Sequence, residues 1–213
     1  KNHFDVRSIF SNEMGSALAK RVDSNLLQLV VKASRTSANI AGDTGAGLEI
    51  VDADADTNMD SLIASLFEGI QSLDEKDVPS TERYIVVSPD IYYKLANVDK
   101  LVSRDFSANN GDFGKGTVVA IGGVPVIKSN TAVDAFTDTS SASTTGTNNN
   151  YNVNAGDVQA VLFQRGAIGT IKRKDLTLES TYDPRRMGTL MTARMMVGHN
   201  ILRPECAVSI NKS

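Results

Sequence analysis

An unbroken amphipathic stretch near the start of the chain constrains the fold more than any other feature. Between residues 4 and 33, apolar side chains recur every three or four positions: Phe10, Met14, Leu18, Val22, Leu26, Leu29, Val30 and Ala33. This spacing predicts one α-helix, because residues three and four apart share a helix face. At 1.5 Å per residue, such a helix would be roughly 40 Å long. We therefore expect a strut that packs on a sheet rather than a coiled coil, because Ser, Asn and Gly15 interrupt the apolar repeat.

Charge is distributed in three blocks along the 213 residues. The formal balance is +2 over residues 1–45, −10 over residues 46–163 and +5 over residues 164–213. An acidic middle between two basic ends suggests an inserted domain, with the two ends folding together. Chance clustering of solvated charge explains the pattern equally well. The net charge of −3 argues against a dedicated nucleic-acid-binding domain.

Local patterns in the rest of the chain predict a mixture of helices and strands, the α+β class. Residues 34–60 are polar and indicate a loop, and Asp60 is positioned to cap a helix over residues 61–73. The remaining predicted elements are a strand at 83–88, a short helix at 90–98, a turn-rich stretch at 103–116, a hairpin of 118–121 with 124–127 around two glycines, an exposed mobile loop at 137–154, a strand at 158–163 and a turn at 166–169. From Lys172 onward, alternating apolar residues, including those at 207–210, predict long antiparallel strands.

The acidic run of Asp52, Asp54 and Asp56 is similar to the opening of a calcium-binding loop. Such a loop also needs glycine at its sixth position and glutamate at its twelfth, and these positions hold Thr57 and Ile63. A solvated acidic loop is therefore the favoured interpretation.

Other signals of chemistry are weak. The glycine-rich patch of Gly42, Gly45 and Gly47 has no following Lys-Ser or Lys-Thr pair, so it does not form a phosphate loop. With two histidines, His3 and His199, and one cysteine, Cys206, the chain offers little for a metal site or a catalytic triad. We expect no cofactor, no metal and no enzymatic activity, and the apolar runs are too short to cross a membrane.

The final fifty residues carry the most specific signal. The segment Leu-Phe-Gln-Arg-Gly-Ala-Ile-Gly-Thr-Ile-Lys-Arg-Lys-Asp-Leu covers residues 162–176, and Gly-His-Asn-Ile-Leu-Arg-Pro-Glu-Cys-Ala covers residues 198–207. Both segments resemble the C-terminal part of the major capsid proteins of T-seven-like, short-tailed bacteriophages. The resemblance extends more loosely over almost the whole chain.

That resemblance implies the Hong Kong 97-type capsid fold: a long spine helix with an elongated antiparallel sheet (the P domain) and an inserted mixed α/β axial domain (the A domain). Residues 1–45 would be the spine-helix part of the P domain, residues 46–170 the A domain, and residues 171–213 the long P-domain strands. In the family an N-terminal arm and an extended E-loop precede the spine helix. Because the chain starts at Lys1 rather than at methionine, we expect these two segments to be missing from it.

The function implied by the resemblance is self-assembly, through pentamers and hexamers, into an icosahedral shell around double-stranded DNA. Implied partners are scaffolding and portal proteins and DNA held without sequence readout, with no membrane; assembly would occur in the host bacterial cytoplasm and the product would be the virion capsid. We expect a basic set to meet an acidic set on a neighbouring subunit. The basic set is Arg165, Lys172, Lys174, Arg185, Arg186 and Arg203, and the acidic set is Asp52, Asp54 and Asp56. Two alternatives remain open: an encapsulin-like compartment, and a cellular α+β enzyme or ligand-binding domain.

Overall fold

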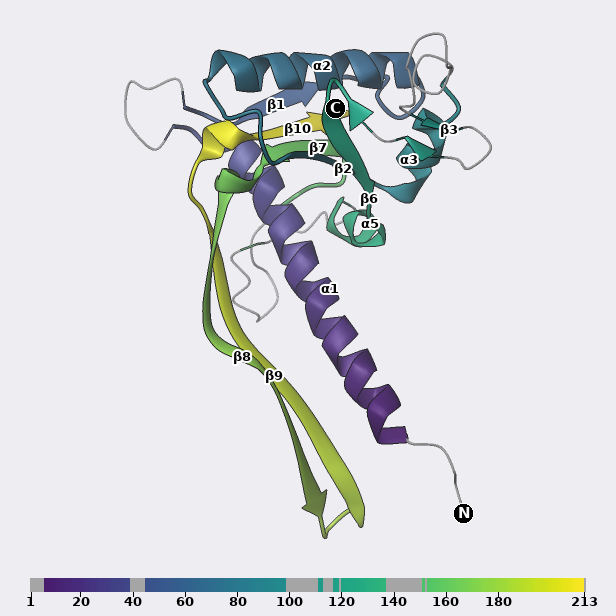
Figure 1. Cartoon of the computed structure of the whole chain (residues 1–213), viewed down its shortest axis with the longest axis vertical. Helices are drawn as coiled ribbons and strands as arrows, with labels where there is room; N and C mark the ends of the chain where they lie inside the picture. The colour runs from purple at the N-terminus through teal and green to yellow at the C-terminus, as the bar shows by residue number, and fades with distance from the viewer. Residues whose placement is uncertain are drawn as a thin grey trace.

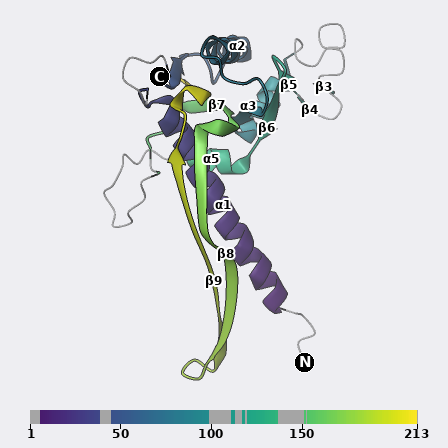
Figure 2. The same cartoon turned by 60° about the vertical axis from the view of Figure 1, so that its left-hand side comes forward.

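The computed structural model describes residues 6–38, 45–98, 111–112, 117–118, 120–136, 151 and 153–212. These residues form a compact body from which a long extension projects (Figures 1 and 2). The body contains a six-stranded mixed sheet, and the extension contains the first half of a long helix beside a long β-hairpin.

Helix α1 (Val6–Ser34) runs for 29 residues, so the predicted long amphipathic helix is confirmed; residues 4 and 5 of the predicted range lie outside the described residues. The two halves of α1 have different surroundings. Residues 8–23 are exposed or half-buried, whereas Leu29, Val30 and Val31 are at most 3% exposed. The expected packing on a sheet therefore holds for the second half, and the first half lies beside the hairpin (Figure 1).

The strand order of the six-stranded sheet is β1 (Leu48–Val51), β10 (Ala207–Asn211), β7 (Val158–Gln164), β2 (Arg83–Val87), β6 (Val124–Lys128) and β5 (Ala120–Ile121). β1 pairs parallel with β10 and β2 pairs parallel with β6, and the other neighbours are antiparallel. β10 is buried along its whole length, as a strand covered on both faces should be. The predicted strands at 83–88 and 158–163 are confirmed as β2 and β7.

Two sequence predictions about this sheet are wrong. Residues 207–210 do not continue the long strands, because β10 returns to the body and lies between β1 and β7. Residues 34–60 are not wholly a loop, because Leu48 to Val51 pair with Val208 to Asn211. A run of only four strand residues in a polar stretch gives little periodicity to detect.

Helices cover the two faces of the sheet. α2 (Met59–Glu75) lies against the face to which Leu162 and Val208 point, because a Cβ placed on Gly69 would be 3.2 Å and 3.3 Å from their methyl carbons. The next residue of β10, Ser209, is hydrogen-bonded through its Oγ to Ser34 Oγ of α1 at 2.8 Å. Because successive strand side chains point to opposite faces, α1 covers the face opposite to α2.

The observed starts of α2 and α3 differ from the predicted ones. The side chain of Asn58, rather than Asp60, caps α2: its Oδ1 accepts hydrogen bonds from the backbone N–H groups of Asp60 and Ser61 at 3.1 Å and 3.4 Å. α3 (Pro89–Leu95) begins one residue before the predicted helix of residues 90–98, with Ser88 as its cap, and it ends three residues before the predicted limit.

The β5–β6 turn contains the predicted glycine pair, with positive φ angles of 57° at Gly122 and 80° at Gly123. Helix α5 (Asn130–Phe136) follows β6 and packs near α1, and β3 (Gly111–Asp112) pairs with β4 (Thr117–Val118). Of the predicted stretches at 103–116 and 137–154, residues 103–110, 113–116, 137–150 and 152 lie outside the described residues.

The predicted long antiparallel strands are β8 (Ile168–Asp183) and β9 (Gly188–Ile201). They form one hairpin whose register runs from Ile168 opposite Ile201 to Asp183 opposite Gly188. Short 3-10 turns connect the hairpin to the body: η2 (Arg165–Ala167) stands where a turn was predicted at 166–169, and η3 (Pro204–Cys206) leads into β10.

Candidate functional site

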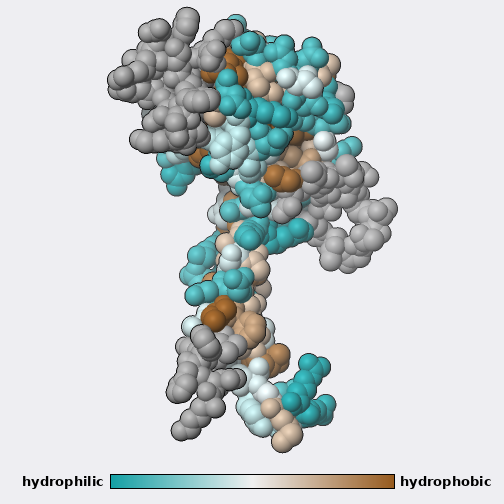
Figure 3. Space-filling view, turned by 90° about the vertical axis from the view of Figure 1, so that its right-hand side faces the viewer, coloured by the Kyte–Doolittle hydropathy of each residue, from teal (hydrophilic) through white to brown (hydrophobic). Residues whose placement is uncertain are grey.

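The extension carries large apolar side chains that the chain itself leaves exposed. We call this set the extension ribbon, and it contains Ile9, Phe10, Ile171, Leu176, Leu178, Tyr182, Leu190 and Met196. Ile171 is 78% exposed, and Phe10 and Leu190 are both 56% exposed. Figure 3 shows apolar surface along the extension below the body. Soluble monomers rarely expose so many large apolar groups in one region, so this surface is suited to burial against another protein.

The strand pattern explains why the ribbon is uncovered. Along β9, Met191, Met195 and Val197 are half-buried, whereas the intervening Leu190 and Met196 are exposed. Alternate side chains of a strand point to opposite faces. Leu190 and Met196, with Ile171 opposite Gly198, lie on the hairpin face that has no partner in the described chain. Leu178 and Tyr182 lie opposite Ala193 and Thr189, so they share the face of Met191 and Met195, which α1 covers only in part.

The tip of the hairpin combines an apolar knob with two cations. Met187 is 83% exposed and has a positive φ of 50°. Asp183 Oδ1 accepts a hydrogen bond from the backbone N–H of Arg185 at 3.0 Å, which holds the tight turn. The side chains of Arg185 and Arg186, both predicted interface residues, are exposed beside Met187.

The other predicted basic residues are exposed, and three of them are paired within the chain. Arg165 Nη1 lies 2.8 Å from Glu82 Oε1, and Arg203 Nε lies 2.6 Å from Glu205 Oε1. Hydrogen bonding to these glutamates raises the pKa of both arginines. Lys172 pairs with Asp175 on β8, and Lys174 is exposed on the same strand. The Arg165–Glu82 and Lys172–Asp175 pairs are exposed, so they contribute little to folding and can exchange partners, whereas the Glu205 side chain is only 16% exposed.

Of the predicted acidic residues, Asp52 serves the fold. Burial would raise the pKa of its carboxyl, but hydrogen bonds from Ser61 Oγ at 2.7 Å, the Asp54 N–H at 3.1 Å and Ser65 Oγ at 3.0 Å outweigh this and lower the pKa below its usual range. The carboxylate thus fastens the end of β1 to α2.

The other two acidic residues lie nearer the surface. Asp54 is exposed, and Asp56 Oδ2 lies 3.1 Å from Lys212 Nζ, whose hydrogen bond lowers the pKa of Asp56. Within the described chain, none of the three aspartates forms an ion pair with the predicted basic set.

His199 lies where β9 meets the body. Its ring is buried, Nδ1 lies 2.9 Å from Thr170 Oγ1, and its backbone N–H donates to Tyr151 Oη at 3.0 Å. Burial lowers the pKa of the imidazole. The arrangement favours a neutral packed histidine, and the described residues contain no group of three or more side chains suited to hold a metal ion.

Cys206 is a packed hydrophobe, as predicted: it is fully buried, and burial raises the pKa of its thiol. No helix in the described part of the chain has the length and apolar character needed to cross a bilayer.

Comparison with known proteins identifies the family. The Gp10A-like major capsid protein family model matches residues 1–211. The chain is 25% identical to the major capsid protein of Escherichia phage T7 over 228 aligned positions, which cover 98% of this chain and 66% of that protein. The chain therefore spans slightly less than two thirds of the length of this curated relative.

Solved structures agree with the sequence comparison. The capsid structure of the cyanophage P-SCSP1u is 33% identical, with a TM-score of 0.86 over 99% of this chain and 67% of the matched chain. The mature capsid of bacteriophage PhiM1 is 22% identical, with a TM-score of 0.79 over 99% of this chain and 66% of the matched chain, and it supports the fold alone. The predicted Hong Kong 97-type α+β fold is confirmed. The strut helix, the long hairpin and the match over nearly all of its length lead to one assignment: the chain belongs to the Gp10A-like family of major capsid proteins.

Proposed function

We propose that this chain is the shell-forming part of the major capsid protein of a short-tailed bacteriophage, and that it self-assembles into the icosahedral shell that encloses the double-stranded DNA genome. The observation that carries the proposal is the extension ribbon, an exposed apolar surface on an element that projects from the body. Burial of apolar surface is the dominant favourable term in protein association. The relatives named above are phage capsid proteins, which favours this role over an encapsulin-like compartment or a cellular enzyme.

The assembly would depend on repeated modest contacts. Each subunit offers the ribbon, the hairpin tip and several exposed charges, and closure of a symmetric shell multiplies these contacts. In this proposal the P domain contains residues 1–45 and 171–213, and residues 46–170 form the A domain. β10 lies in the P-domain range but pairs with β1 and β7 of the A-domain range, so the two domains would share this sheet.

The partners follow from the same proposal. Copies of the chain would form pentamers and hexamers, with scaffolding and portal proteins joining during assembly in the host cytoplasm. DNA would be enclosed without sequence readout, which is consistent with a net charge of −3. The exposed residues Lys174, Arg185 and Arg186 remain the best placed of the predicted basic set to reach a neighbour, because the structure gives their side chains no carboxylate partner among the described residues.

Electron microscopy of the full-length protein tests the proposal. Wild-type protein should form closed shells, and a variant with Ile171→Asp and Leu178→Asp should remain as subunits or small oligomers, because charge on the ribbon opposes its burial. Val51→Asp, at a 62% exposed apolar residue of β1 outside the ribbon, is the control and should assemble. Normal shells from the double variant would exclude the ribbon as an interface, and a wild-type protein that stays monomeric would overturn the function.

A further inference from the structure

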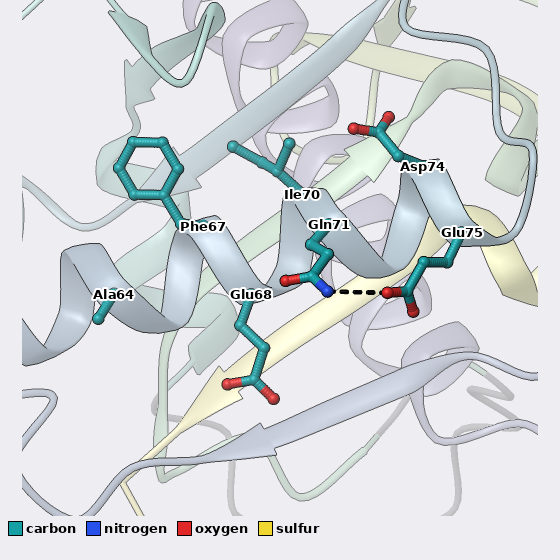
Figure 4. Close-up of a pocket in the computed structure, with 7 residues that line it drawn as sticks. All are labelled: Ala64, Phe67, Glu68, Ile70, Gln71, Asp74 and Glu75. Carbon is teal, nitrogen blue, oxygen red and sulfur yellow. Dashed lines mark hydrogen bonds between the residues drawn. The ribbon is translucent and has the colours of Figure 1, made fainter.

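The outer surface of α2 carries an aromatic side chain among carboxylates. Phe67 is 50% exposed, and Glu68, Asp74 and Glu75 lie along the same shallow hollow (Figure 4). Asp74 forms an ion pair with the buried Arg83, with Oδ1 and Nη1 2.7 Å apart. Glu75 accepts a hydrogen bond from Gln71 at 2.8 Å. Within the described chain, Glu68 has neither an ion pair nor a hydrogen bond. The surface therefore combines the Phe67 ring, which we call the α2 knob, with the Glu68 carboxylate, and Figure 4 shows that these two side chains project to opposite sides of the helix.

A groove on the other side of the body has the opposite character. It has a volume of about 460 Å³ and is lined by α1, by the neighbouring strands β2 and β7, and by the start of β8. Its apolar lining residues are Leu26, Leu27, Val30, Tyr84, Phe163 and Ile168. Arg165 also lines it, and the Arg165 side chain is 76% exposed. We call this the α1 groove.

The knob and the groove lie on opposite faces of the same sheet. Phe163 lines the α1 groove, and the preceding residue Leu162 points to α2. Successive side chains of a strand alternate between faces, so the sheet separates the two surfaces. They cannot meet within one chain, but they can meet between two copies.

We propose that the α2 knob of one copy docks into the α1 groove of the next copy, with Phe67 against the apolar lining and Glu68 beside Arg165. The occupant is a second copy, because Glu68 on one surface and Arg165 on the other have opposite charge and each lies near apolar side chains. Arg165 can turn to the new carboxylate because its present pair with Glu82 is exposed and weak. The inference rests on the proposed function and assigns to it a head-to-tail contact.

A contact between two different surfaces of the same protein is heterologous, and it generates a closed ring when the rotation between copies closes. This is the geometry that the pentamers and hexamers of the proposed shell require. The extension ribbon and the hairpin tip are then free to form other contacts of each subunit.

Cross-linking of assembled full-length protein tests the contact directly. Glu68→Cys and Arg165→Cys, combined in one chain and treated with a short bismaleimide, should give a ladder of covalent oligomers up to complete rings. Either single variant should stay monomeric on a denaturing gel, while co-assembly of the two should give dimers only. Cys206 should not react because it is fully buried. The matched control replaces Glu68→Cys with Asp90→Cys on α3, an exposed carboxylate away from α2, and should give no ladder.

Charge reversal provides a second measurement without a reagent. Arg165→Glu and Glu68→Arg should each lower the yield of shells by about fivefold or more, and their combination should restore it to within about twofold of wild type. Combining Arg165→Glu with Asp90→Arg should restore nothing. Wild-type shells without a cross-linked ladder, or charge reversals that leave the yield unchanged, would overturn the contact while leaving the proposed function intact. Absence of wild-type shells would instead count against the function.

Discussion

At the scale of single residues, Asp52 shows how a carboxylate in an acidic run serves the fold. Asp52→Ala leaves the hydroxyls of Ser61 and Ser65 without their acceptor and should lower the free energy of unfolding by about 1–3 kcal/mol at neutral pH. Urea unfolding of the unassembled chain measures this. Asp54→Ala is the control and should change stability by less than about 0.5 kcal/mol, since the Asp54 side chain is exposed.

The same site predicts the sign of a pH effect. The folded-state pKa of Asp52 is lowered, so its contribution is fully present above the unfolded-state pKa of about 3.9 and is lost as pH falls through the folded-state pKa. The difference in stability between wild type and Asp52→Ala should therefore shrink below about pH 4. A difference that grows on acidification would contradict this assignment.

Gly47 gives a second prediction at this scale. A Cβ at this position would lie 2.2 Å from the Ala33 carbonyl oxygen and 2.5 Å from that of Ser34, both at the end of α1. Backbone atoms cannot move aside as a flexible side chain can, so Gly47→Ala should cost about 1–3 kcal/mol in thermal or urea unfolding. Gly123→Ala is an instructive comparison: nothing lies within 4 Å of its Cβ, and any cost there comes from its φ of 80°.

At the scale of elements, α1 should behave as two units. Ala17 is exposed in the first half of the helix, where the hairpin is the neighbour, and the second half is buried in the body. Ala17→Pro removes a helix hydrogen bond at a cost of about 3 kcal/mol. We expect amide hydrogen exchange to accelerate over residues 8–17 while β2, β7 and β10 keep their protection. Ala17→Ser is the control, and loss of protection throughout the sheet would show that the two halves fold as one.

The sequence predicts these elements unevenly, for physical reasons. The three-to-four spacing in α1 and the alternation in β9 follow from local backbone geometry, so both could be recognised. The strand with which a segment pairs is not determined by local geometry. The residues from Ala207 to Ile210 have the same alternating pattern whether they extend the long hairpin or pair within the central sheet. The extension ribbon was not anticipated, because Ile171 and Leu178 are apolar residues of the kind found in cores. Only the fold shows that α1 leaves one face of the hairpin uncovered and the other partly exposed.

The interface predictions divide in the same way. Exposure of the basic residues could be expected from their charge, but the internal role of Asp52 depends on α2 folding over the end of β1. Phe67 is an apolar residue of α2 and is nevertheless 50% exposed. The knob that it forms becomes apparent only when the sheet shows which side of α2 is covered.

At the scale of the whole molecule, a substitution at the hairpin tip should change the stability of the subunit and its assembly in opposite directions. Met187 holds a positive φ of 50°, a conformation that costs a residue with a side chain about 1–2 kcal/mol and costs glycine little. Met187→Gly should therefore raise the free energy of unfolding of the unassembled chain by about 1 kcal/mol.

If the tip contacts a neighbour in the shell, the same change removes an apolar side chain that is 83% exposed in the single chain. The concentration at which shells appear, followed by light scattering, should then rise severalfold although each subunit is more stable. Met187→Leu keeps an apolar group and should leave this threshold near wild type, and a lower threshold in Met187→Gly would show that the tip makes no contact that assembly needs.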